Sequence, residues 1–309
     1  MVAQADSTKI SFIAYWSKGD SYDFKVSKVK REWEKETLTK KDSSQYIANF
    51  KVLDSTESSY KIQWTFKNNI ISSFQENSKK YFKDKKVLKE IIAKNDFSKI
   101  IYKTNEFGEF IEIVNWEDLA ETTRLLLEEV IKSFEDKDPV KIASFRKKMQ
   151  PIVDIYTSQS GIEQLALKEL QYFHYPFGLE YDVTQPIEYE QDLKNMLGGK
   201  PIRSETTLTF EEVDFENYYC SIKEESELNS QDSKRVIKKL LKKMGLSDSE
   251  TKKSISNAFL DIKDLNYYQY YYYPGVPHYI YGSRKSILKI DDEDKTKIDE
   301  IFIELIYEE

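Results

Sequence analysis

The segment from Asn266 to Gly282, NYYQYYYYPGVPHYIYG, decides how this chain is expected to fold. Its Pro-Gly-Val-Pro sequence at 274–277 is typical of a tight turn, because proline and glycine both favour turn conformations. The flanking residues favour strands, in which successive side chains point to opposite faces. Alternate tyrosines would then line two faces: Tyr268, Tyr270 and Tyr272 on one, Tyr267, Tyr271 and Tyr273 on the other. The segment therefore predicts an antiparallel hairpin.

Three further hairpins are predicted in the first third of the chain. Residues 9–16 are expected to pair with 21–29, residues 46–52 with 60–66, and residues 99–104 with 109–114. Short turn-like stretches separate the two members of each pair, and glycine permits the positive φ that such turns often need. A lysine-rich helix is expected at residues 75–95.

Two blocks have apolar residues at helical spacing, one over 116–172 and one over 230–262. Within the first block Pro151 is expected to begin a helix, because proline is tolerated at the first helical position but not inside a helix. Ser160 to Glu163 has the spacing of a capping box for another helix. Two glycines at 198–199 are expected in a loop between strands.

The predicted order is strands, helices, strands, helices, strands. Because hairpin-length connections dominate, we expect the α+β class, with a predominantly antiparallel sheet built from hairpins and two helical inserts packed on it. We expect a single α+β domain over residues 8–309. The alternative is an N-terminal unit of hairpins and helices at 8–175 and a C-terminal α+β unit at 176–309.

Charge and hydropathy limit the cellular locations and the classes of partner that we expect for this protein. The formal net charge of -7 opposes general attraction to nucleic acids, which we do not expect as partners. No window approaches the ~18 consecutive apolar residues that a membrane-spanning helix needs. Ala3-Gln4-Ala5 matches the small-x-small pattern at a signal-peptidase site. We expect a periplasmic or secreted protein after signal-peptide removal, with the cytoplasm as the alternative; the oligomeric state stays open.

Signals for catalysis and cofactors are weak. The two histidines, His174 and His278, lie far apart in sequence, and the lone Cys220 has no second cysteine. We therefore expect no metal ion and no cofactor. Phosphate-binding glycine motifs and the G-x-S-x-G motif are absent from the sequence. No catalytic residue is singled out, although the acidic stretch at 211–216 leaves a carboxylate-dependent hydrolase open.

A strongly basic amphipathic segment, KRVIKKLLKKMG, follows at 234–245. Such a helix can lie on an anionic membrane, or it can pack its apolar stripe on a sheet and leave its lysines in water. The stripe lacks the Trp or Phe anchors expected at a membrane interface, which favours packing on the sheet.

The tyrosine hairpin is the main candidate for a binding site. No Lys or Arg occurs between Asn266 and Gly282, so the segment does not match a single-strand nucleic-acid platform. Tyrosine combines a large contact area with a polar tip, which suits either a packed strand or a face that binds carbohydrate, peptide or another protein. The candidate binding residues are Tyr268, Tyr270, Tyr272, His278, Tyr279 and Tyr281.

Three segments carry a resemblance to known proteins: YWSKGD at 15–20, YKIQWTF at 60–66, and NEFGEFI at 105–111 followed by NWE at 115–117. Together they resemble a loose group of exported, functionally uncharacterised proteins of the Gram-negative cell envelope. The resemblance implies an envelope setting and a β-rich fold. It carries over no catalytic or ligand-binding residue.

We therefore expect a non-enzymatic envelope protein that binds a protein, glycan or apolar ligand through its sheet. One alternative is a carrier of a lipid or acyl chain in a cavity under a curved sheet. Another is the carboxylate-dependent hydrolase. A continuous apolar cavity would favour the carrier, and an exposed tyrosine face over a filled core would favour the binding protein.

Overall fold

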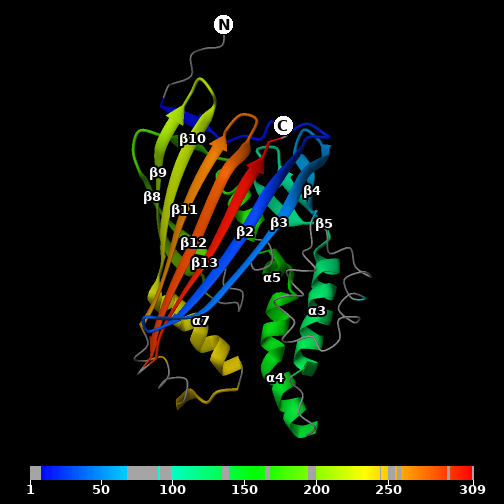
Figure 1. Ribbon diagram of the computed structural model, residues 1–309, viewed down its shortest axis with the longest axis vertical. Coiled ribbons are helices and arrows are strands. Elements are labelled where there is room, and N and C mark those ends of the chain that lie inside the picture. The colour runs from blue at the N-terminus through cyan, green and yellow to red at the C-terminus, as the bar shows by residue number, and fades with distance from the viewer. Residues whose placement is uncertain are drawn as a thin grey trace.

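The computed structural model describes residues 8–67, 90, 99–133, 139–163, 168–193, 200–243, 245–249, 255, 259–290 and 293–307 (Figure 1). The strands are β1 (Lys9–Ser11), β2 (Ser21–Glu34), β3 (Thr37–Ser55), β4 (Ser59–Phe66), β5 (Lys99–Asn105), β6 (Phe110–Ile113), β7 (Glu180–Asp182), β8 (Ile187–Leu193), β9 (Ile202–Asp214), β10 (Tyr219–Leu228), β11 (Phe259–Tyr271), β12 (Val276–Ile290) and β13 (Glu293–Ile306). The helices are α3 (Trp116–Ser133), α4 (Pro139–Tyr156), α5 (Gln159–Gly161), α6 (Lys168–His174) and α7 (Ser230–Lys243).

Eleven of the described strands form one open antiparallel sheet, in the order β6-β5-β4-β3-β2-β13-β12-β11-β10-β9-β8. Neighbours in the sheet are neighbours in sequence everywhere except at β2 and β13, which pair antiparallel in the middle. This seam joins strands from both sides of residue 175. The expected α+β class with a mainly antiparallel sheet is confirmed, while the choice between one domain and two stays a prediction.

The tyrosine hairpin forms as predicted. β11 and β12 pair antiparallel, with Tyr268 opposite Ile280 and Tyr267 opposite Tyr281. Gly275 in the turn has φ +90°, a conformation that glycine adopts without strain. The register shifts between Gln269 and Tyr270, which marks a β-bulge. The predicted pairings of β3 with β4 and of β5 with β6 are also confirmed.

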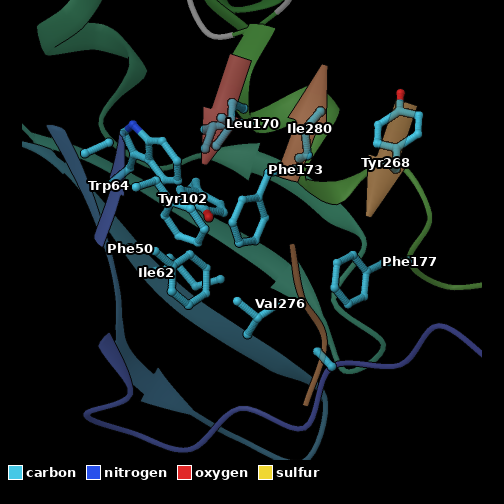
Figure 2. Close-up of a cluster of buried hydrophobic side chains, with 14 of the residues drawn as sticks. Phe50, Ile62, Trp64, Tyr102, Leu170, Phe173, Phe177, Tyr268, Val276 and Ile280 are labelled. Atoms are coloured by element: carbon cyan, nitrogen blue, oxygen red, sulfur yellow. The ribbon is translucent and has the colours of Figure 1, made fainter. Parts of the chain in front are cut away.

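The core lies on one face of the sheet, beneath α6; we call this the inner face. Phe173 of α6 is fully buried, and its ring centroid lies 5.4 Å from that of Phe24 and 5.1 Å from that of Phe50. Figure 2 shows Phe173 among Phe50, Trp64 and Tyr102. Such ring pairs stabilise the fold by about 0.5 to 1.5 kcal/mol each beyond the area they bury. The first helical block of the sequence is thus held on the sheet, at its C-terminal end, by aromatic contacts.

Residues 9–16 do not form the predicted hairpin with 21–29. Ile10 of β1 pairs with Tyr181 of β7 in a separate two-stranded ribbon. Beyond it, the backbone amides of Phe12 and Ala14 donate to the carbonyl oxygens of Leu179 and Phe107, at 3.0 and 2.9 Å. Apolar and polar residues alternate over 9–16 as in a strand. Only residues 9–11 pair with a strand, β7, whereas Phe12 and Ala14 bond to loops.

Three helix predictions are corrected. Pro151 lies inside α4 rather than at its start; because proline has no backbone N–H, it cannot donate to the carbonyl of Lys147 four residues earlier. The cap is Ser158, whose hydroxyl accepts from the Gly161 amide, and not Ser160. The second block does not stay helical to residue 262, because β11 begins at Phe259. The helix expected at 75–95 and the loop at 198–199 fall, apart from residue 90, outside the described residues.

Candidate functional site

Aromatic side chains gather on the face of the sheet opposite the core, which we call the outer face. Because side chains alternate along strands, Tyr267 and Tyr281 lie on this face, while their neighbours Tyr268 and Ile280 are buried on the inner face. Each of the rings on the outer face is partly exposed. They form what we call the outer aromatic surface: Tyr219, Tyr267, Tyr271, His278, Tyr279, Tyr281, Phe302 and Tyr307.

The rings of this surface contact one another in two rows across β10 to β13. In the first row, ring centroids lie 5.7 Å apart for Tyr219 and Tyr271, 6.0 Å for Tyr271 and His278, and 5.8 Å for His278 and Tyr307. The Tyr307 hydroxyl lies 2.6 Å from His278 Nδ1. Mutual contacts on strands of one sheet fix the rings, so little side-chain freedom remains to be lost on binding.

The second row joins Tyr267, Tyr281 and Phe302. The Tyr281 ring centroid lies 6.2 Å from that of Tyr267 and 5.1 Å from that of Phe302. Partial burial raises the pKa of Tyr281, and in the first row it raises the pKa of Tyr307 to about 12. Both hydroxyls are therefore protonated at neutral pH and can donate as well as accept hydrogen bonds.

The candidate residues predicted from the sequence divide between the two faces. His278, Tyr279 and Tyr281 lie on the outer face. Tyr268 and Tyr270 lie on the inner face with 1% and 0% of their surface exposed. Tyr268 donates to Glu224 Oε2 at 2.9 Å, and Tyr270 donates to the Phe173 carbonyl, so both serve the core.

The sixth candidate, Tyr272, begins the turn after β11 and packs its ring 5.8 Å from Tyr218 and 6.4 Å from Phe12. Five members of the outer aromatic surface were not among the predicted candidates: Tyr219, Tyr267, Tyr271, Phe302 and Tyr307. Four of them are strand residues that alternate with buried neighbours, and Tyr307 follows the end of β13. Which face they share can be told only once the strand register is known.

A groove of about 920 Å³ lies beside this surface, mainly over the outer face of β8 to β12. Five exposed glutamates line it: Glu188, Glu190, Glu205, Glu225 and Glu227. Lys263 and Lys285 line its other side, and Lys263 Nζ lies 3.1 Å from Glu227 Oε2. The groove is therefore polar and predominantly acidic.

A polar network is buried on the inner face beside α6. Glu224, 6% exposed, accepts from Asn266 Nδ2 at 2.8 Å as well as from Tyr268. Burial raises the pKa of Glu224. One row further along, Arg284 donates through Nε and Nη2 to the two carboxylate oxygens of Asp264, at 2.7 and 2.6 Å. These bonds link β10, β11 and β12, although Asn266 Oδ1 is buried without a hydrogen-bond partner.

His174 and Cys220 are core residues. The Gly108 carbonyl lies 2.8 Å from His174 Nδ1, so Nδ1 carries the proton, and Nε2 accepts from the Tyr102 hydroxyl at 2.9 Å. Desolvation lowers the pKa of His174 to about 4 and raises that of the Cys220 thiol. In the part of the chain that the structure describes, no group of three His, Cys, Asp or Glu side chains is placed to hold a metal ion.

The basic helix α7 is tied to the sheet at its first turn. Asp232 pairs with Arg203 of β9 at 2.8 Å and with Arg235 of its own helix at 2.6 Å. The helix also contacts β11. Among the helices of the described residues, none has the length and apolar character that crossing a membrane requires.

Comparisons with known proteins give only distant likenesses. No family model and no curated protein matches the sequence. A lipovitellin structure, described for its lipid-protein interactions, is 8% identical to this chain, with a TM-score of 0.42. The alignment covers 94% of this chain and 25% of the lipovitellin chain, so this chain spans about a quarter of the length of lipovitellin. A Bacteroides fragilis protein of YmcC-like fold, assigned as exported, is 8% identical with a TM-score of 0.21, over 96% of this chain and all (100%) of its own.

The attachment protein Ail of Yersinia pestis, solved with the heparin analogue sucrose octasulfate, is 5% identical with a TM-score of 0.16, over 94% of this chain and 100% of Ail. With TM-scores below 0.5, none of these three likenesses supports an argument about function. The Bacteroides protein is at most consistent with the expected resemblance to exported proteins.

Proposed function

We propose that this is a non-enzymatic binding protein that takes its partner on the outer aromatic surface. The observation that carries the proposal is a set of eight part-exposed rings on one face of the sheet, seven of which contact one another in two rows. Tyrosine-rich surfaces of this kind supply large contact areas, and their hydroxyls give directional hydrogen bonds. Because the sheet already holds the rings, binding costs little ordering. From the resemblance to exported proteins, we place this activity in the cell envelope.

The two alternatives have less support. A carrier needs an apolar cavity, whereas the inner face beneath α6 is filled by rings such as Phe173 and Trp64, which is 1% exposed. A hydrolase of this type needs a carboxyl group of raised pKa that reaches an open cleft, whereas Glu224, whose pKa burial raises, is bonded to Tyr268 and Asn266 on the inner face. The partner itself is a protein or a glycan, which the next experiment separates.

Hydroxyl-radical footprinting tests the proposal without a known ligand. The purified protein is oxidised in buffer and again in an envelope extract of its host, and the modification of each tyrosine is measured by mass spectrometry. We expect Tyr267, Tyr279 and Tyr281 to be protected in the extract. Protection that disappears after protease treatment of the extract indicates a protein partner, and protection that disappears after glycosidase treatment indicates a glycan.

Two exposed tyrosines outside the surface provide internal controls. Tyr15 and Tyr273 are 51% and 55% exposed and contact each other at the ends of loops. Their oxidation should be the same in buffer and in extract. Equal oxidation of all five tyrosines under both conditions contradicts the proposal, as does protection of Tyr15 and Tyr273 alone.

A further inference from the structure

A row of like charges crosses three strands of the outer face beside the aromatic surface. Glu190 of β8 stands directly opposite Glu205 of β9, which in turn stands opposite Glu227 of β10. Like charges in directly opposed positions destabilise a sheet. In the part of the chain that the structure describes, Glu190 and Glu205 form no ion pair with a lysine or arginine, although Arg203, which stands opposite Asp192, attracts Glu190 at longer range. The isolated protein therefore bears a local electrostatic cost at the floor of the groove.

The groove reaches an open edge of the sheet. β8 is the last strand of the sheet in the described residues, so one side of its backbone has no strand partner there. Its outward side chains are Glu188, Glu190 and Asp192, at every second position. An extended segment can add to such an edge through main-chain hydrogen bonds, and its alternate side chains then meet those of the edge strand.

The charge of the edge selects among possible occupants. A second copy of this chain would bring the same carboxylates to the edge and be repelled, and nucleic acid or anionic lipid would be repelled as well. A segment with lysine or arginine at alternate positions would place cations opposite Glu188, Glu190 and Asp192. The neighbouring rings add a second attraction, because aromatic faces also attract lysine and arginine.

We infer that the partner presents a basic, extended polypeptide segment, which pairs along β8 and lays its cationic side chains over the acidic groove. The inference rests on the proposed function, since it names the partner class of the same face. The segment neutralises Glu190 and Glu205, since Glu227 at the end of the row is already paired with Lys263, and its remaining residues reach the outer aromatic surface.

The test uses a short synthetic peptide that alternates lysine and threonine, titrated into the full chain at low salt by isothermal titration calorimetry. Comparison peptides replace lysine with glutamate, or threonine with proline, which removes backbone donors needed for strand pairing. The groove variant carries Glu188→Gln, Glu190→Gln and Glu205→Gln. Its matched control carries the same change at three exposed glutamates that do not line the groove: Glu36, Glu57 and Glu106.

We expect the lysine peptide to bind, the groove variant to weaken binding by about threefold or more, and the control variant to leave it unchanged, as the loss of three exposed ion pairs implies. The glutamate and proline peptides should bind more weakly than the lysine peptide. Raising the salt concentration should weaken binding to the unmodified protein more than to the groove variant. The melting temperature measured without peptide should also differ. Because the groove variant lacks the opposed carboxylates, it should melt at a higher temperature than the control variant.

Failure of this inference is distinguishable from failure of the proposed function. A triple variant with Tyr267→Ser, Tyr279→Ser and Tyr281→Ser is titrated in parallel. Peptide binding that survives the tyrosine changes but not the groove changes supports the basic segment and contradicts the aromatic site. If peptide binding survives the groove changes but not the tyrosine changes, the inference of a basic segment over the groove is wrong, and the proposed function still holds. No binding of the lysine peptide, or equal binding of the proline peptide, overturns the inference outright.

Discussion

Acidification from pH 7 to pH 5 should destabilise the protein through the buried His174. In the folded chain desolvation lowers the pKa of this imidazole from 6.5 to about 4. Between these values the unfolded chain binds a proton that the folded chain does not, so stability falls as the pH falls through this window. At about 1.4 kcal/mol per pKa unit, the full loss is about 3 kcal/mol, of which about 2 kcal/mol falls between pH 7 and pH 5.

Urea denaturation of the unmodified protein and of His174→Gln, at both pH values, measures this contribution. The substitution lowers stability at pH 7, because the bonds to Tyr102 and Gly108 are lost or distorted. It should nevertheless reduce the difference in unfolding free energy between pH 7 and pH 5 by about 2 kcal/mol. Taking this difference between variants removes the contributions of carboxylates that titrate in the same range.

The second histidine of the chain is a matched control. His278 is part-exposed on the outer face, so His278→Gln controls for the removal of an imidazole that is not buried. If His174→Gln and the unmodified protein lose the same free energy between pH 7 and pH 5, the reasoning about the buried neutral imidazole is refuted.

Three other substitutions or reactions test the packing. Gly282→Ala should cost about 1 to 3 kcal/mol in urea denaturation, because its Cβ would lie 2.6 Å from Tyr172 Cζ; an unchanged midpoint would contradict the close approach of α6. Phe173→Ala should cost about 3 to 5 kcal/mol, whereas Phe107→Ala, at a side chain that is 42% exposed, should cost far less, and similar losses would mean that the core is misplaced. Cys220 should react with a thiol reagent only at the rate of unfolding, since its side chain is buried and burial raises its pKa; rapid reaction of the native protein would contradict this placement.

Local signals in the sequence were enough for most of the hairpins and for the order of strands and helices. Alternation around a turn is a short-range pattern, and β3 with β4 and β11 with β12 both follow it. The partner of residues 9–11 is β7, far along the chain, and no local pattern in either segment specifies that pairing. Phe259 was assigned to a helix because apolar spacing alone does not separate a short helix from the start of a strand.

The sequence predicted which hairpin carries the candidate site, but not which of its residues lie on the outer face. The tyrosine hairpin does carry three of the predicted residues on the outer face, but alternation cannot say which face a helix will cover. That choice depends on α6, whose Tyr172 lies against Gly282 and whose Phe173 packs between strands. Once α6 covers one face, Tyr268 and Tyr270 belong to the core, and their odd-numbered neighbours remain available to a partner.

The pairing of β2 with β13 has a consequence for synthesis. β2 leaves the ribosome long before β13, so β2 has only β3 beside it until β13 has also been made. Its free edge, Ser21–Glu34, is then a long template for wrong pairing with other chains. Six lysines, arginines and glutamates between Lys25 and Glu34 reduce that risk. A chain truncated before β13 should therefore remain dependent on a chaperone, however complete its other hairpins are.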